Sequence, residues 1–252
     1  VGVISYRTMR DRPTISLWSD VLSASRGELG GITSKNHSGL FISFEGGEGS
    51  GKSTQTQLLK EYLESSGEKV LLTREPGGTP LGKKLRDILL DNKTGNISPR
   101  AEALLYAADR ANHVHSLIQP ALAKGEVVIT DRYLDSSIAY QGAGRILQPA
   151  EVARISRWAT ENLAPTLTII MDIPAEVGLA RLQSRDRLEA EPLAFHERIR
   201  QEFLNIANSD PDRYLVVDAT QAKELIHEEI VERVSKLAKL KINQTEQKRF
   251  RK

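Results

Sequence analysis

The stretch "FEGGEGSGKST" at residues 44–54 follows directly on the apolar run "LFIS". Inside it, the spacing of Gly46, Gly51, Lys52 and Ser53 is that of a phosphate-binding loop. Glycines let consecutive backbone N–H groups point at one anion, and the helix that follows adds unsatisfied donors and the positive end of its dipole. The stretch therefore predicts a strand, a phosphate-binding loop and a helix in succession, which is how a nucleotide-binding α/β domain begins.

The same loop indicates which phosphate ligand it takes. Lys52 is expected to reach the β- and γ-phosphates, and the Ser53 hydroxyl to ligate Mg²⁺. A dinucleotide fingerprint is excluded, because Gly47 and Gly49 would need a third glycine where Lys52 stands. The sequence therefore predicts a nucleoside triphosphate as the ligand.

The composition of the chain limits the other chemistry that it can perform. Its 252 residues are 39% hydrophobic and 27% charged, which is ample for one core. It has no cysteine, so disulfides, thiolate metal sites and cysteine nucleophiles are excluded. The net charge of +2 argues against a dedicated nucleic-acid binder, and no stretch approaches the roughly 20 apolar residues that span a bilayer. We expect a soluble cytoplasmic protein that binds neither nucleic acid nor membrane.

Apolar strands alternate with helical segments along the chain. The pattern predicts strands at residues 40–45, 70–73, 126–130, 166–173 and 214–219, and helices at 51–65, 81–90, 99–122 and 222–239. Strands that are apolar almost throughout and separated by helices favour a parallel sheet covered on both faces. The predicted fold class is α/β, a P-loop NTPase fold with a five-stranded parallel sheet.

The two ends differ from the middle of the chain. Residues 1–38 are rich in Ser, Gly and Arg and lack periodicity, so we expect a poorly ordered N-terminal extension, or a true start at Met9. Acidic residues in this segment disfavour a transit peptide. Residues 242–252 form a basic C-terminal tail. A single domain is therefore predicted over residues 39–241.

A second group of polar residues follows the third predicted strand. Asp131 lies at its carboxyl end, the edge where open α/β sheets bind ligands. Arg132, Ser137, Tyr140 and Gln141 come next. This polar set suits a second, nucleotide-sized ligand beside the first.

Five sequence blocks occur in the order and rough spacing found in thymidylate kinases. They are "FEGGEGSGKST", "TREPGGTPLG" (73–82), "LLYAADR" (104–110), "DRYLDSSIAYQG" (131–142) and "SRDRLE" (184–189). The chain resembles the bacterial type of this family over residues 39–241, with a lid near residues 181–192 that supplies basic side chains. The resemblance implies phosphoryl transfer from ATP to dTMP, giving ADP and dTDP, with Mg²⁺ as cofactor and a homodimer as assembly.

On the donor side, the resemblance implies an ATP site in the loop and a catalytic set around it. The ATP site comprises Gly46, Gly47, Glu48, Gly49, Ser50, Gly51, Lys52, Ser53 and Thr54. The catalytic set comprises Lys52, Asp131, Arg132, Arg185 and Arg187, with Ser53 and Asp131 organising the metal. Catalysis of this kind is mostly positioning and electrostatic stabilisation, because two polyanions must approach each other. The lid arginines are expected to close over the phosphates and exclude water.

On the acceptor side, the resemblance implies a dTMP site. Its residues are Glu48, Arg74, Tyr106, Arg110, Arg132, Ser137, Tyr140 and Gln141. Arg110 and Arg132 match residues that hold the acceptor phosphate, where a planar guanidinium can grip two oxygens. Tyr106 matches the aromatic residue that stacks on thymine, and Glu48 matches the acidic residue that faces the sugar 3′-hydroxyl.

Two alternative functions stay open from the sequence. One is another nucleoside-monophosphate kinase, and the other is an ATP-dependent switch protein that transfers nothing to a small molecule. A GTPase is disfavoured, because the sequence most similar to its Asn-Lys-x-Asp motif is "NKTG" at residues 92–95, which ends in glycine instead of aspartate. His113 and His115 are two residues apart and so face different sides of a helix, which indicates structural or solvated residues rather than metal ligands. Trp158 is expected in the core.

Overall fold

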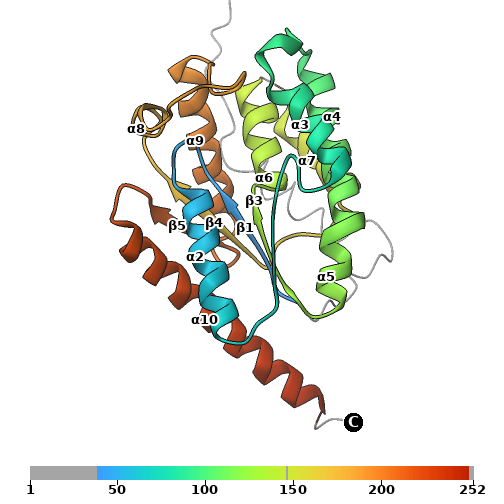
Figure 1. Cartoon of the computed structure of the whole chain (residues 1–252), viewed down its shortest axis with the longest axis vertical. Coiled ribbons are helices and arrows are strands. Elements are labelled where there is room, and N and C mark those ends of the chain that lie inside the picture. The colour runs from blue at the N-terminus through green and yellow to red at the C-terminus, as the bar shows by residue number, and fades with distance from the viewer. Residues whose placement is uncertain (1–38, 146, 250–252) are drawn as a thin grey trace, which may run out of the picture. The chain divides into compact units, whose positions relative to one another are not determined.

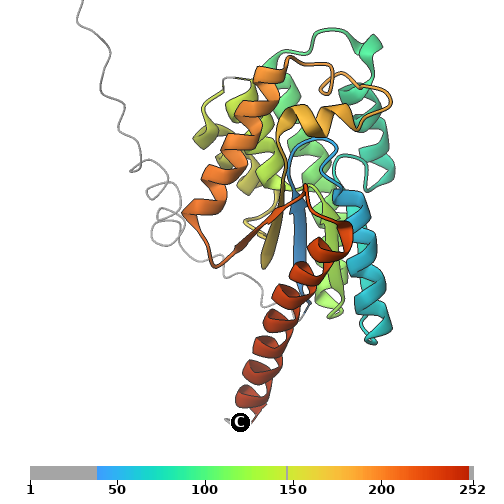
Figure 2. The same ribbon diagram turned by 90° about the vertical axis from the view of Figure 1, so that its left-hand side faces the viewer.

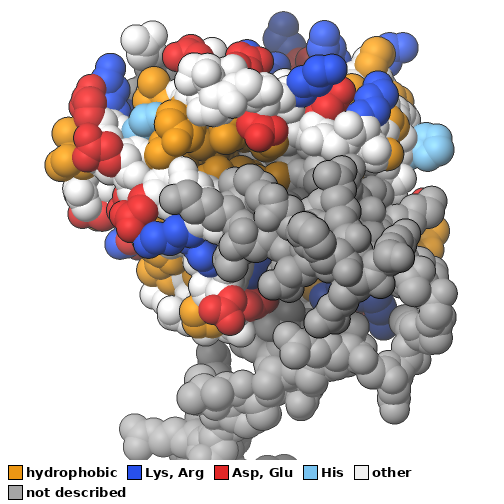
Figure 3. Space-filling view, turned by 90° about the horizontal axis from the view of Figure 1, so that it is seen from below, with side chains coloured by type: hydrophobic (Ala, Val, Ile, Leu, Met, Phe, Trp, Pro, Cys, Tyr) orange, Lys and Arg blue, Asp and Glu red, His pale blue; other side chains and the backbone are white. Residues whose placement is uncertain are grey.

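The computed structural model describes residues 39–145 and 147–249, with side chains as far as residue 237. The predicted extension at residues 1–38 lies outside the described residues. Within the described part, no helix is long and apolar enough to cross a membrane. Figure 3 shows acidic and basic side chains interspersed on the visible part of the lower face, with no single sign of charge dominating it.

A five-stranded, all-parallel sheet forms the centre of the domain (Figure 1). Its order is β2-β3-β1-β4-β5. The strands are β1 (Phe41–Glu45), β2 (Val70–Arg74), β3 (Val127–Asp131), β4 (Leu167–Asp172) and β5 (Tyr214–Asp218). Each boundary lies within one residue of the prediction, and the predicted fold class is confirmed.

The strand register places the functional segments together. Phe44 of β1 pairs with Asp131 of β3, and Arg74 of β2 pairs with the same Asp131. The chain therefore leaves three neighbouring strands at one edge of the sheet, where the phosphate-binding loop follows β1. In a parallel sheet this carboxyl edge is the place where ligands bind.

Helices cover both faces of the sheet (Figures 1 and 2). On one face, α2 (Lys52–Ser65) and α10 (Lys223–Arg249) pack on the strands and on each other. Leu59 of α2 and Ile230 of α10 are fully buried in a core cluster with Phe44 of β1. On the other face, α9 (Leu193–Ser209) packs on β4 and β5.

The helical segments differ from the prediction in three ways. The predicted helix at residues 99–122 is α4 (Pro99–His113), a π-helical turn, η2 (Val114–Ile118), and α5 (Gln119–Ala123). Pro120 has no N–H for the helical ladder, which accounts for the irregular turn just before it. Helix α10 continues through residues 242–249 of the predicted tail. The prediction also missed the helices between β3 and β5, which are α6 (Leu134–Ser137), the π-helical η3 (Ile138–Gly144), α7 (Pro149–Ala159), α8 (Ala175–Ala180) and α9.

One core expectation was wrong. Trp158 of α7 is 82% exposed, although an indole ring carries a large apolar surface. The residues that α7 does bury are small or β-branched, namely Val152, Ala153, Ser156 and Ala159. They allow the helix to pack closely while the indole points outward.

Candidate active site

The phosphate-binding loop is shaped by two glycines that no other residue could replace. Gly46 and Gly49 have φ angles of 133° and 64°, in the region that disfavours side chains. A Cβ on Gly46 would lie 2.5 Å from the carbonyl oxygen of Met171, and one on Gly49 would lie 2.0 Å from that of Gly178. The loop is therefore fixed against β4 and α8 and forms a cradle lined by backbone.

Lys52 is the first residue of α2, and its side chain turns back into this cradle. Its Nζ donates to the carbonyl oxygens of Gly46 and Gly47 at 3.2 and 2.7 Å, and to the Ser50 hydroxyl at 3.2 Å. Burial and the nearby Arg132 lower the pKa of Lys52 to about 8. An anion entering the cradle would compensate both effects, because it restores a partner charge to a poorly solvated ammonium.

Two oxygen ligands stand at the mouth of the cradle. The Ser53 hydroxyl donates to Asp131 Oδ2 at 2.8 Å, and both residues line the same cavity. A hydroxyl and a carboxylate are hard oxygen donors, and Mg²⁺ usually takes one or two such protein ligands together with phosphate oxygens. The residues present therefore fit Mg²⁺, and that they bind it stays a prediction.

The cavity around the loop gathers most of the predicted donor-site residues. We refer to it as the donor cavity, and its lining is Glu48, Gly49, Ser50, Gly51, Lys52, Ser53, Thr54, Arg74, Glu75, Arg86, Asp131 and Arg132. Gly46 and Gly47 contribute the carbonyl groups that bind Lys52. Arg74 lines this cavity and not its neighbour, which differs from the prediction that placed it with the acceptor.

A second cavity adjoins the first, and we refer to it as the acceptor cavity. It is lined by Glu48, Glu75, Pro76, Arg86, Leu90, Tyr106, Arg110, Arg132, Tyr133, Ser136, Ser137, Tyr140, Gln141, Asp186, Leu188 and Glu189. Apart from Arg74, every residue predicted for the dTMP site lies in this lining. The two cavities share Glu48, Glu75, Arg86 and Arg132.

Arg132 lies at the boundary between the cavities. Its φ angle of 70° is unusual for a residue with a side chain, and such strain is common at functional sites. One terminal nitrogen donates to Glu48 Oε1 at 2.8 Å, the other donates to the Gly46 carbonyl oxygen at 3.0 Å, and the guanidinium lies 5.0 Å from the centre of the Tyr140 ring. Burial alone would raise the pKa of Glu48, but Arg132 and Lys52 outweigh it and lower this pKa to about 2. Arg132 is thus held where a phosphate between the cavities would meet it.

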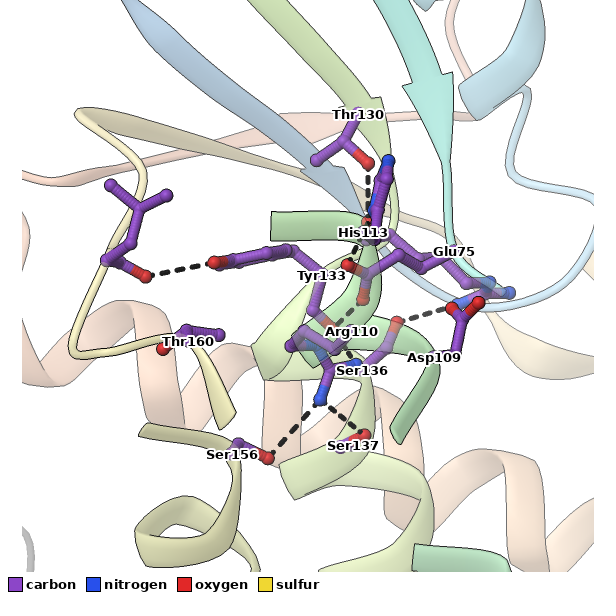
Figure 4. Close-up of polar contacts among 12 residues, drawn as sticks. Glu75, Asp109, Arg110, His113, Thr130, Tyr133, Ser136, Ser137, Ser156 and Thr160 are labelled. Atoms are coloured by element: carbon purple, nitrogen blue, oxygen red, sulfur yellow. Dashed lines mark hydrogen bonds and ion pairs between the residues drawn. The ribbon is translucent and has the colours of Figure 1, made fainter. Parts of the chain in front are cut away.

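Arg110 is held by the protein on several sides (Figure 4). It is 1% exposed, and its Nε donates to Glu75 Oε2 at 2.7 Å. Its terminal nitrogens donate to the hydroxyls of Ser137 and Ser156 at 3.1 and 3.3 Å and to the Tyr133 carbonyl oxygen at 3.1 Å. These contacts occupy four of its five N–H groups, so the two-oxygen grip on phosphate that we expected would require one of them to break. Its contact with the acceptor phosphate stays a prediction.

Glu75 joins Arg110 to a buried histidine in the same network (Figure 4). His113 is fully buried, with Nδ1 2.9 Å from Glu75 Oε1 and Nε2 2.7 Å from the Thr73 hydroxyl. Because a carboxylate only accepts, Nδ1–H donates to Glu75, and Nε2 pairs with the Thr73 hydroxyl. His113 thus has the structural role that the sequence predicted, tying α4 to the loop after β2.

Asp109 is a buried carboxylate with an incomplete set of partners. Its Oδ1 accepts from the Gly77 backbone N–H at 3.3 Å, while Oδ2 has no hydrogen-bond partner among the described residues. Burial and the neighbouring Glu75 raise the pKa of Asp109 to about 6. The folded protein therefore holds this proton more tightly than the unfolded chain does.

Asp109→Asn is expected to change how stability depends on pH. The folded pKa lies above the ordinary 3.8, so the wild type is stabilised when Asp109 is protonated and loses that stability as the pH rises from about 4 to about 6. The neutral variant escapes this loss. Urea unfolding gives the free energy of unfolding of both proteins at pH 4 and at pH 7. The value for the variant minus that for wild type should be about 2 kcal/mol higher at pH 7 than at pH 4. An equal difference at the two pH values would contradict the prediction.

The predicted lid arginines are placed differently from each other. Arg187 donates through Nε to the Leu89 carbonyl oxygen at 2.8 Å, and a terminal nitrogen binds Glu102. Arg185 is exposed, and its carbonyl oxygen accepts from Asn92 at 3.3 Å. Neither arginine lines the donor cavity, because the lid segment lies against the end of α3 (Pro80–Leu90) and the start of α4. Their contact with the transferred phosphoryl group stays a prediction.

Several polar residues that shape the site were not predicted from the sequence. Arg86 of α3 lines both cavities and donates to the Pro76 carbonyl oxygen at 3.0 Å. Glu45, the last residue of β1, accepts from the Tyr133 N–H at 2.8 Å and the Ser136 hydroxyl at 2.6 Å. Burial and a nearby carboxylate raise its pKa to about 8. A charged residue closing an otherwise apolar strand was the available signal for Glu45, whereas Arg86 looks like an ordinary helix residue.

The fold and site are those of a P-loop nucleotide kinase. Asp131 ends the strand beside the one that leads into the phosphate-binding loop, and Arg132 lines both the donor cavity and the acceptor cavity. A family model described as thymidylate kinase matches residues 44–230 of the chain. The chain is 54% identical to a thymidylate kinase of Clavibacter sepedonicus, over 76% of this chain and 92% of the relative. It is 51% identical to one of Bifidobacterium longum (strain DJO10A), over 80% of this chain and 100% of the relative.

A solved structure gives the same result. The crystal structure of thymidylate kinase from Ehrlichia chaffeensis matches with a TM-score of 0.64 and 33% identity, covering 77% of this chain and 97% of that one. The chain belongs to the thymidylate kinase family.

Proposed function

We propose that the chain transfers the γ-phosphoryl group of ATP to dTMP, giving ADP and dTDP. The observation that carries this proposal is the pair of adjoining cavities with Arg132 and Glu48 on their common boundary. A switch protein would need only the first cavity. Membership of the thymidylate kinase family supports dTMP over other monophosphates as the acceptor.

On the donor side, the loop and Lys52 bind the triphosphate. Backbone N–H groups of the cradle and the start of α2 meet the phosphate oxygens, and Lys52 exchanges its loop carbonyl partners for them. Ser53 and Asp131 are the residues that would hold Mg²⁺, which when bound neutralises charge on the phosphates. The positive charge of Lys52 stabilises the negative charge that spreads over the transferred group in the transition state.

On the acceptor side, Arg132 holds the phosphate of dTMP at the boundary between the cavities. Tyr106 and Tyr140 form aromatic walls for the nucleoside, and Ser137 and Gln141 supply polar contacts. Glu48 anchors Arg132 and accepts the Tyr140 hydroxyl at 2.5 Å, so the phosphate-binding and nucleoside-binding residues are positioned together. This arrangement brings the attacking phosphate oxygen toward the cradle, and positioning of this kind supplies much of the rate of phosphoryl transfer.

The proposal extends to the oligomeric state and the cellular location of the protein. We propose a homodimer in the cytoplasm, with small nucleotides as the other partners. Large apolar side chains exposed on α3, α4 and α7 support an interface between copies, namely Leu81, Ile88, Leu104 and Trp158. Their packing against a second copy would remove apolar surface from water.

The assignment is tested by steady-state assays with ATP, Mg²⁺ and a panel of monophosphates. We expect kcat/KM for dTMP to exceed that for AMP, CMP and GMP by a factor of about a hundred or more, since a site built around hydrogen-bonded groups rejects ligands that leave them unpaired. Equal turnover of dTMP and the other monophosphates would refute the proposed acceptor. Binding of ATP without binding of dTMP in calorimetry would instead favour the switch protein.

A further inference from the structure

Glu102 is a charged residue without any exposed surface. It lies in the first turn of α4, where acidic side chains ordinarily sit in solvent near the positive end of the helix dipole. Its exposed fraction is nevertheless 0%. A buried carboxylate is costly unless it is paired and hydrogen-bonded, so its partners indicate its role.

The partners of Glu102 come from two segments that enclose the acceptor cavity. Oε1 accepts from Gln141 Nε2 at 3.1 Å and from Arg145 Nε at 3.2 Å. Oε2 accepts from a terminal nitrogen of Arg145 at 3.4 Å and from one of Arg187. Arg145 is also paired with Glu191, and Arg187 with a backbone carbonyl, so the two guanidinium groups hold the carboxylate in one place.

This pairing fixes the polarity of Gln141. Both oxygens of this carboxylate accept from guanidinium N–H groups, so the amide of Gln141 must turn its NH₂ toward Glu102. Among the described residues, no group donates to the remaining Oε1. Gln141 lines the acceptor cavity, so it can offer a ligand there Oε1 as an acceptor and the second N–H of Nε2 as a donor, and the bond to Glu102 prevents the two from exchanging places.

We propose that Glu102 is a positioning residue that selects the base through Gln141. The inference rests on the proposed function. With Oε1 presented, the cavity favours a pyrimidine whose ring nitrogen N3 carries a hydrogen, as in thymine. It disfavours cytosine, in which N3 is itself an acceptor and would leave Oε1 unpaired. Because Arg187 belongs to the predicted lid, the same carboxylate also ties the lid segment to the residue that reads the base.

Glu102→Gln tests the positioning role. The new amide has nearly the same shape but can donate as well as accept, so Gln141 is free to turn over. We expect the preference for dTMP over dCMP, measured as the ratio of their kcat/KM values and of their dissociation constants, to fall about tenfold or more, mainly through a higher KM for dTMP. If the role of Glu102 were merely structural, the substitution would lower kcat/KM for dTMP and for dCMP in the same proportion and leave their ratio unchanged.

Matched variants separate the possible outcomes. Glu191→Gln removes the other carboxylate that binds Arg145 but does not contact Gln141, so the ratio should stay at its wild-type value. If Glu102→Gln does not fold, Glu102→Gln combined with Arg145→Gln removes one charge of each sign, and the same fall in the ratio is expected. A ratio within threefold of wild type in a folded variant would overturn the positioning role alone. A wild-type protein that does not phosphorylate dTMP would overturn the proposed function and this inference with it.

Discussion

Lys52→Ala is expected to lower kcat by about a thousandfold while changing the KM for dTMP much less. The ammonium lies inside the cradle of the phosphate-binding loop, where its Nζ is 2.7 Å from the Gly47 carbonyl oxygen. Charge spreads over the phosphoryl oxygens in the transition state, so a fixed cation there stabilises the transition state more than the bound substrates. Removing one such group from a preorganised site costs about 10² to 10³ in kcat. Steady-state kinetics with saturating MgATP measures the effect.

Lys60→Ala is the matched control for this substitution. It removes the same side chain from the same helix, but Lys60 is paired with Glu64 on the solvent side, away from both cavities. We expect wild-type kinetics from this control. Equal thermal melting of the two variants would show that the loss in Lys52→Ala comes from the chemistry. A fall in kcat of less than tenfold would contradict the role assigned to Lys52.

Much of the fold could be predicted because the strands carry a strong local signal. A parallel sheet covered on both faces leaves its strands apolar almost throughout, as in "TLTIIMDI", and turn residues or helices bound each one. The two longest helices missed between β3 and β5 do carry a buried face at helical spacing: α7 buries Val152, Ala153, Ser156 and Ala159, and α9 buries Phe195, Ile199, Phe203 and Ile206. Their apolar pattern was therefore available in the sequence and was not used. Trp158 shows a limit of the local pattern, since its exposure depends on which face of α7 meets the domain.

The candidate site could be predicted where residue type and motif spacing agree. Lys52 and Asp131 line the donor cavity, as expected from their places after β1 and at the end of β3. The supporting residues could not be found in this way. Glu102 looks like an ordinary acidic residue in a first helical turn, and only its contacts with Arg145 and Arg187, which are distant in sequence, reveal it as buried. Contacts of this kind, between residues that support the site from behind, are fixed by tertiary packing and leave no local pattern in the sequence.

Arg110→Ala is expected to destabilise the protein as well as weaken its use of dTMP. The sequence places Arg110 among the residues expected to hold the acceptor phosphate, so its loss is expected to weaken the use of dTMP. The structure adds that Arg110 and Glu75 are paired at 2.7 Å with side chains that are each 2% exposed. Removing the guanidinium leaves Glu75 as a buried charge without its main counter-ion, and breaking a buried pair in this way costs about 3 to 5 kcal/mol. Urea unfolding should show this loss in the free energy of unfolding, and for a domain of this size the melting temperature should fall by roughly 10 °C.

Two further variants identify the unpaired charge as the cause. Arg110→Met with Glu75→Gln removes both charges, and replacing a buried pair by neutral groups is far less costly than removing one partner, so much of the lost stability should return. Arg200→Ala breaks an ion pair of similar geometry with Asp172, but these side chains are 31% and 21% exposed, so we expect a loss of about 1 kcal/mol or less. If Arg110→Ala unfolded no more easily than Arg200→Ala, Arg110 would be free to move toward a substrate phosphate. The original assignment of Arg110 as a phosphate-gripping residue would then be favoured over a structural one.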